Sequence, residues 1–332
     1  MSIVTKSQLQ EILQSLLASG AQVAAPVVVS EGRFFFQYLT QSEEAVLDSS
    51  IMPTNSIKEF FFPKHEILYT FHREGKEVKL TDAEPFVGPQ FVFGARPCDA
   101  ASLPILDKVF AWDFQDRFYQ SRREHTTVVS IACEAADVNC FCTSVGLSPA
   151  STEGADAMLL DLKDGTYEVR ILTDKGKKLF GDKVSKSNKI GTTAIPPEKK
   201  FDCERVQRYL TEHFDEPIFD VTGLRCVGCG VCTYLCPTCH CFDIVDEGGT
   251  TQGKRVKNWD TCQFAQFTHH ASGHNPRENQ SQRQRNRIQH KFRIYPEKFG
   301  VLLCTGCGNC TRECSATLGV WPVLKEIDEK AK

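Results

Sequence analysis

The first 200 residues alternate short apolar runs with polar turns, a pattern that predicts a mixed α/β domain. Leucine and isoleucine recur with helical spacing from Leu9 to Leu17, between Ser7 as a candidate N-cap and Gly20, which predicts one amphipathic helix. Strands are expected where apolar residues run together or alternate, at residues 91–93, 126–132, 157–162 and 166–172.

A segment rich in Lys, Gly, Ser and Pro at about 176–200 separates this part from the rest of the chain. We therefore predict an α+β protein in which an N-terminal mixed α/β domain (1–200) precedes a ferredoxin-like domain (201–332). The second domain carries a long insert at about 237–303, rich in Gln, Asn, Arg and His. We expect this insert to be an exposed loop with one helix near its end, at 286–292.

The chain has 332 residues and 16 cysteines, twelve of which lie between Cys203 and Cys314. The first residues lack the pattern of a secretory signal, so we expect a cytoplasmic protein. Clustered cysteines in a reducing compartment bind metal or perform redox chemistry, whereas disulfide scaffolds are typical of short secreted chains. A net charge of −3 and the lack of a long apolar run favour neither a nucleic-acid partner nor a membrane span.

The strongest motif is an internal repeat with the spacing C-x2-C-x2-C-x3-C, which starts at Cys226 and again at Cys304. In such repeats three cysteines hold one [4Fe–4S] cluster, and the fourth cysteine ligates the other cluster. The predicted ligands are Cys226, Cys229, Cys232 and Cys314 for cluster one, and Cys304, Cys307, Cys310 and Cys236 for cluster two. A zinc ribbon is the alternative, but a structural zinc ion takes four thiolates, and here eight fall in two matching runs.

Several stretches beyond the repeat make the chain similar to the family of hydrogenase beta subunits and anaerobic sulfite reductase iron–sulfur subunits over nearly its whole length. These stretches are residues 60–63, 94–99, 140–144, 236–243, 259–262 and 289–292. The resemblance implies an iron–sulfur electron-transfer subunit of a cytoplasmic oxidoreductase complex. Its partners would be a subunit that binds flavin and uses NAD(P)H, and a catalytic subunit of the hydrogenase, sulfite reductase or heterodisulfide-reductase type.

The sequence contains no GxGxxG or P-loop pattern and no distinct nucleophile or acid–base group. We therefore expect no catalytic residue in this chain and a flavin on the partner. The alternative is a flavin-binding oxidoreductase whose N-terminal domain performs the two-electron step itself.

The four cysteines of the N-terminal domain are candidate ligands of a third iron–sulfur cluster: Cys98, Cys133, Cys140 and Cys142. Cys98 and Cys133 each follow a predicted strand, and strand ends of one sheet can converge on a site. Asp99 is expected to cap the helix that follows, and Arg96 would add positive charge. Four thiolates suffice for a cluster; the alternative is that the thiols pack in the core as small apolar groups.

The remaining candidates lie in the insert. Cys239, Cys241 and Cys262 either bind a further metal with His240 or pack inside the insert, the interpretation that we favour. An exposed loop is expected for His269, His270 and His274. A solvated face, or a docking surface for an acidic partner, is expected for the basic residues Arg277, Arg283, Arg285, Arg287, Lys291 and Arg293.

Overall fold

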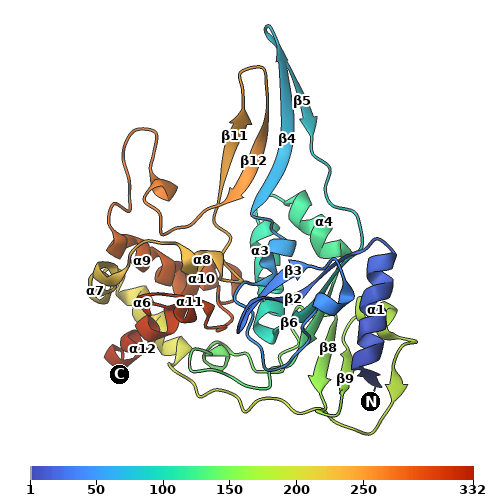
Figure 1. Ribbon diagram of the computed structural model, residues 1–332. Helices are drawn as coiled ribbons and strands as arrows, with labels where there is room; N and C mark the ends of the chain where they lie inside the picture. The colour runs from blue at the N-terminus through green and yellow to red at the C-terminus, as the bar shows by residue number, and fades with distance from the viewer. Residues whose placement is uncertain (1) are drawn as a thin grey trace.

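The computed structural model describes residues 2–332 and contains two β-sheets and a helical C-terminal region (Figure 1). The larger sheet has the strand order β10-β1-β9-β8-β7-β6-β2-β3, and its centre, from β2 through β6 and β7 to β8, is parallel. Its strands are β1 (Ser2–Thr5), β2 (Gln22–Ser30), β3 (Arg33–Tyr38), β6 (Gln90–Ala95), β7 (Thr126–Ile131), β8 (Ala157–Asp161), β9 (Thr166–Ile171) and β10 (Ser185–Lys186).

Helices cover both faces of this sheet because its central strands are apolar on both sides. Helix α1 (Lys6–Ala18) and α5 (Asp174–Phe180) pack on the face that contains Phe93 and Val129. Helix α3 (Ser102–Phe110), α4 (Arg117–His125) and the 3₁₀ turn η2 (Ile57–Phe60) pack on the face that contains Val92 and Val128. The N-cap of α1 is Thr5 and not Ser7, since Thr5 and Gln8 form a reciprocal capping box.

The smaller sheet is a four-stranded antiparallel arm with the order β11-β12-β4-β5. It combines two hairpins, β4 (His65–Glu74) with β5 (Glu77–Asp82), and β11 (Phe242–Gly248) with β12 (Gln252–Trp259), and it projects from the body of the molecule (Figure 1). The expectation that the insert is an exposed loop is therefore wrong for residues 242–259. Strands form there because β12 gains a partner on both sides, a long-range pairing with β4 that the local pattern does not reveal.

The C-terminal region is helical, and its core joins the segments that flank the insert. Its apolar centre includes Val206, Leu210, Ile288, Phe292 and Leu324. Its helices are α6 (Cys203–Glu212), α7 (Ile218–Arg225), α8 (Val231–Tyr234), α9 (Gln280–Gln289), the π-helical η5 (His290–Ile294), α10 (Tyr295–Phe299), α11 (Asn309–Arg312) and α12 (Val320–Lys330). The protein is thus an α+β protein, as predicted.

Short elements complete the chain: α2 (Pro97–Ala100) and the 3₁₀ turns η1 (Ser42–Glu44), η3 (Cys142–Val145) and η4 (Gln266–Thr268). The segment expected as a linker contains most of α5 and all of β10, and only residues 187–200 lack regular elements. From residue 2 to residue 332, no helix combines the length and the apolar character that a bilayer crossing requires.

Candidate iron–sulfur centres

The four cysteines assigned to cluster one line a single cavity of about 380 Å³ of empty space: Cys226, Cys229, Cys232 and Cys314. The loop before α8 turns tightly at Gly228 (φ +69°) and Gly230 (φ +75°), in the left-handed region that favours glycine. A Cβ on Gly230 would lie 2.9 Å from the Thr261 side chain. The side-chain amides of Gln280 and Gln284 donate hydrogen bonds to Cys226 Sγ at 3.3 and 3.0 Å. The cradle of cluster one therefore combines a tight loop with neutral donors.

The second repeat forms a similar loop in a different environment, pressed against the N-terminal domain. Gly306 (φ +67°) and Gly308 (φ +79°) repeat the left-handed turns. A Cβ on Gly306 would lie 2.5 Å from the backbone of Cys142, and one on Gly308 would lie 2.5 Å from the carbonyl oxygen of Asn139. The backbone amide of Phe141 also donates to the Gly306 carbonyl at 2.9 Å. Both glycines are thus required by close backbone contact as well as by conformation.

Cys236 from the first repeat lies with the cysteines of the second. Burial, and then the nearby Cys236, Cys310 and Cys304, raise the pKa of the Cys307 thiol well above its ordinary value. The hydrogen bond from Cys239, together with the charges of Lys291 and Lys58, lowers the pKa of Cys236 although the residue is buried. The structure therefore brings together the residues assigned to cluster two, including the exchanged fourth cysteine.

The third group of thiols lines a cavity of its own, with about 400 Å³ of empty space: Cys98, Cys133, Cys140 and Cys142. β6 and β7 are parallel neighbours, so Cys98 in α2 and Cys133 after β7 lie at the same edge of the sheet. Cys307 and Gly306 line this cavity too, which places it beside the second repeat. Burial raises the pKa of Cys133 to about 11 and that of Cys140 to about 12. All four thiols that the sequence singled out in this domain therefore converge.

Positive charge accompanies this third group of thiols. Arg96 is buried and donates to the carbonyl oxygens of Ser49 and Asp48 at 3.0 and 2.8 Å. Arg312 pairs with Asp137 at 2.7 Å. Asp99 is not the N-cap that the sequence suggested.

Asp99 lies inside α2. This helix starts one turn earlier than expected, because Pro97, with its fixed φ, occupies the first helical position after Arg96. Burial raises the pKa of Asp99 to about 7. A helix of four residues adds little dipole, so the positive charge near this group comes mainly from Arg96, which faces Cys133, and from Arg312, which faces Cys140.

The donor chemistry of the three cysteine groups fits iron–sulfur clusters. Thiolates are the ligands that iron–sulfur clusters and zinc select. In the part of the chain that the structure describes, no three His, Cys, Asp or Glu side chains meet closely enough to hold a single ion. The cysteines are spread around cavities instead, as ligands on separate corners of a cube must be. Each repeat also has left-handed glycines, a conformation that allows backbone N–H groups to approach sulfur.

The other cysteines of the insert form neighbouring pairs rather than a further cavity. Cys239 and Cys262 are buried, and Cys241 is half-buried. The hydrogen bond with Cys241 lowers the pKa of Cys262 to about 6. Burial lowers the pKa of His240 to about 4. Packing inside the insert remains our interpretation of these three cysteines. His269, His270 and His274 lie on an exposed loop, as predicted.

The expectation of a solvated basic face is wrong for three of its six residues. Arg283, Arg287 and Lys291 are only 9%, 2% and 2% exposed. All three lie on one helical stretch, and one face of this stretch points toward the cysteines. The polar side chains of that face were not recognised from the sequence. They are Gln280, Gln284, Arg287 and Lys291. The spacing of four, three and four residues is the signal that could have revealed it, because it places all four on one helix face.

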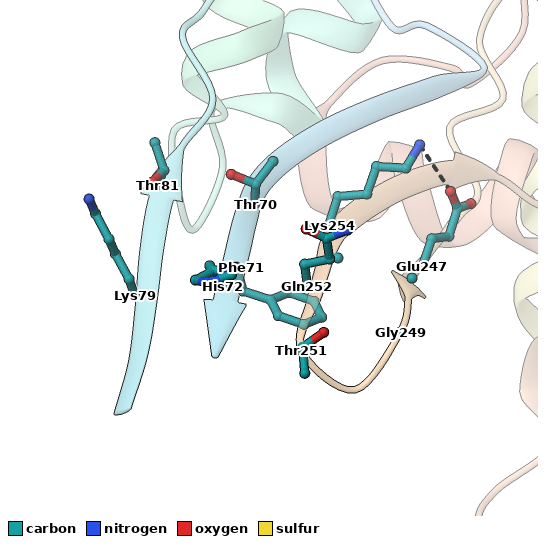
Figure 2. A pocket seen from close by; sticks show the side chains of 12 residues that line it. Thr70, Phe71, His72, Lys79, Thr81, Glu247, Gly249, Thr251, Gln252 and Lys254 are labelled. Carbon is teal, nitrogen blue, oxygen red and sulfur yellow. Dashed lines mark ion pairs between the residues drawn. The ribbon is translucent and has the colours of Figure 1, made fainter. Parts of the chain in front are cut away.

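A separate cleft lies on the arm, away from the cysteines. Figure 2 shows its lining, which comes from the two hairpins and includes Thr70, His72, Lys79, Thr81, Glu247 and Lys254. Lys254 pairs with Glu247 at 3.1 Å between the neighbouring strands β12 and β11. No cysteine lines the cleft, so it contributes nothing to the redox sites.

Comparison with known proteins adds to this geometry. Residues 225–318 match the family described as a 4Fe-4S dicluster domain, so this region is similar to domains that carry iron–sulfur clusters. The chain is also 29% identical over 309 residues to "Sulfhydrogenase 2 subunit beta" of Pyrococcus furiosus, an alignment that covers 89% of each chain. No solved structure matches. Together the two matches support an iron–sulfur subunit of the hydrogenase beta type with a role in electron transfer, which confirms the resemblance drawn from the sequence.

Proposed function

We propose that this chain relays single electrons between a subunit that carries a flavin and a catalytic subunit of a cytoplasmic oxidoreductase complex. The observation that carries the proposal is that the cysteines gather in three groups of four, two of which each line one cavity. Cys314 joins the cavity of the first repeat, and Cys236 joins the second repeat. We assign these two groups to clusters one and two with their fourth ligands exchanged, and the N-terminal group to a third cluster.

The residues of the chain then hold, shield and tune the clusters. A bound cluster supplies one-electron redox chemistry, and no proton donor is needed. The cysteines bind iron, the left-handed glycines allow backbone N–H groups to approach sulfur, and the apolar core around Phe292 keeps water out. The cavity of the N-terminal thiols shares Cys307 and Gly306 with the cradle of cluster two, which supports a direct path for electrons between those two sites.

Contact with the electron-exchange partner is proposed at cluster one. Cys229 is an exposed cluster ligand, and Val227 and Leu224 beside it are 73% and 89% exposed. Large apolar side chains exposed next to a redox site are typical of a protein interface. Leu224→Glu should slow electron exchange with the purified partner subunit while iron content stays constant; an unchanged rate would exclude this face.

The domain boundary at residue 200 is also a proposal. Residues 187–200 lack regular elements, and β12 from the second part pairs with β4 from the first. Limited proteolysis of the cluster-loaded chain should therefore cut within 187–200 and leave two fragments that stay associated through the arm.

The direct test of the function is a chemical count on the full chain purified without oxygen. We expect about eight iron atoms and as much sulfide for two clusters, and about twelve for three, with a brown colour that dithionite bleaches. A colourless chain with bound zinc would contradict the proposal. Stoichiometric flavin in the isolated chain would instead favour the alternative, a flavin oxidoreductase.

A further inference from the structure

Three basic side chains are buried beside the cysteines without a carboxylate partner. Lys58, Arg287 and Lys291 are each 2% exposed, and within residues 2–332 none of them forms an ion pair with Asp or Glu. The buried Lys257 is different, because it pairs with Glu66 at 2.8 Å and with Asp116 at 2.7 Å. A buried charge is costly unless an opposite charge compensates it. The anionic groups that surround these three basic side chains are the cysteine sulfurs, although Lys58 also lies over the Trp259 ring at 4.1 Å.

Lys291 contacts a cluster ligand directly. Its Nζ donates to Cys236 Sγ at 3.2 Å, to Thr238 Oγ1 at 3.2 Å and to the Leu303 carbonyl at 2.8 Å. It lies in the π-helical segment that interrupts the helix after α9, and such interruptions are frequent at functional sites. Three simultaneous donor contacts of Nζ fit the ammonium group, which has three donors and no acceptor and is the ordinary form of lysine at neutral pH.

The surroundings of cluster one lack an equivalent contact. Cys226 accepts hydrogen bonds from the neutral amides of Gln280 and Gln284, and Cys314 accepts one from the backbone amide of Leu318 at 3.4 Å. Arg287 does not distinguish the clusters, since it faces Cys232 of one and Cys310 of the other.

Lys58 also lies on the side of cluster two. Its Nζ donates to the carbonyl oxygens of Thr233 and Cys239, both at 3.0 Å, and it faces Cys236. Lys58 donates to backbone carbonyls, whereas Lys291 donates directly to a ligand sulfur, so Lys291 is the closer of the two positive groups to the cluster. The two cradles share a motif, but within residues 2–332 only a ligand assigned to cluster two accepts a hydrogen bond from an ammonium group.

We propose that Lys291 holds the reduction potential of cluster two above that of cluster one, so that an electron entering at cluster one comes to rest on cluster two. Reduction adds one negative charge to a cluster, and a fixed ammonium ion in buried surroundings stabilises that charge. The transfer moves one electron from cluster one to cluster two; no bond forms or breaks and no proton moves. The inference rests on the proposed function, and it adds a direction to the relay.

The test is a redox titration of the full, cluster-loaded chain followed by EPR. In the wild type we expect cluster two to be reduced first, and Cys229→Ser identifies the signal of cluster one by altering or abolishing that signal alone. Lys291→Met should lower the ratio of reduced to oxidised cluster two at least tenfold at fixed potential, about 59 mV for a one-electron couple. Lys291→Arg keeps the charge and should keep the order of reduction.

Arg293→Met is the matched control. Arg293 lies two residues after Lys291, and its side chain pairs with Glu297 near the surface. The variant therefore removes one positive charge from the same segment without touching a cysteine. An equal shift of both clusters in Lys291→Met, or an equal shift of cluster two in Arg293→Met, would overturn the inference. If Lys291→Met fails to assemble cluster two, the wild-type order of reduction decides. A chain without clusters contradicts the proposed function, whereas clusters of equal potential contradict only this inference.

Discussion

The two cluster cradles are built from the same eleven-residue spacing but lie in different surroundings. The first loop is close to the surface, with Cys229 exposed and amides of glutamine as donors. The second loop is pressed against the backbone of Asn139 and Cys142, and the ammonium group of Lys291 contacts Cys236, the fourth ligand that we assign to its cluster. The spacing of cysteines therefore specifies the ligands, while residues far from the motif decide how tightly a cluster is enclosed and how much charge it meets.

The largest expected effect extends the comparison to the third group of thiols. Cys133→Ser should remove about four iron atoms per chain, the content of one cube, while the spectra of clusters one and two persist. Cys203→Ser is the control, because Cys203 lies at the start of α6 and lines neither of the two cavities that the candidate ligands line. Iron and sulfide analysis measures both variants. Unchanged iron in Cys133→Ser would mean that these four thiols are packing residues.

The next prediction compares matched glycines in the two loops. Gly306→Ala should lower the free energy of unfolding by about 1–3 kcal/mol more than Gly228→Ala, the usual cost of overpacking. Both positions have a left-handed φ, which costs about 1–2 kcal/mol in either variant.

Only Gly306 also faces backbone, at 2.5 Å, whereas the nearest atom to Gly228 is the end of the Gln280 side chain at 3.3 Å. Anaerobic thermal unfolding measures the difference. Equal losses would show that the second loop is not packed as tightly as described.

A pH effect is expected on the side of cluster two. Burial, with Lys291 nearby, lowers the pKa of His240 to about 4; burial and His240 lower that of His290 to about 3. The unfolded chain binds these protons near the ordinary histidine pKa of 6.5. Stability is therefore full above about pH 6.5 and falls as the pH drops toward 4, by up to about 1.4 kcal/mol per pH unit for each proton.

The variant His290→Asn should flatten this dependence of the apparent Tm between pH 6.5 and 5. The exposed His269→Gln should leave it unchanged. If the wild type and His290→Asn lose stability in parallel, the buried histidines are not its source.

The smallest effect concerns the neutral donors of cluster one. Gln284→Leu removes the 3.0 Å hydrogen bond to Cys226 and should lower the potential of cluster one, because a hydrogen bond to sulfur stabilises the reduced state. The shift should be smaller than that of cluster two in Lys291→Met, since an amide carries no net charge. EPR titration of both variants tests the ranking, and a larger shift in Gln284→Leu would reverse it.

Much of this architecture follows from local sequence signals. The strands around residues 91–93 and 126–132 and the pair around residue 164 form as predicted, because apolar runs and turn residues determine them locally. The cysteine repeat leads directly to the groups at Cys226 and Cys304. The convergence of Cys98 and Cys133 follows from their positions after neighbouring parallel strands.

The features that sequence reasoning missed depend on contacts between distant segments. The arm forms because β12 pairs with β4, nearly two hundred residues earlier. Lys291 and Arg287 resemble members of an exposed basic run, but helix periodicity turns them toward the thiols. Basic side chains are rarely buried unless an opposite charge pairs with them. The burial of Lys291 and Arg287 therefore depends on the nearby cysteines, which lie in other segments, and their own helix sequence does not reveal it.

The exchange of fourth ligands is the central claim, and one pair of variants tests it most directly. Cys236→Ser and Cys314→Ser should be compared by EPR after anaerobic reduction. We expect Cys236→Ser to damage the cluster held by the second repeat and to spare the first, and Cys314→Ser to do the reverse. Loss of the cluster in each variant's own repeat, with the other repeat spared, would contradict the account.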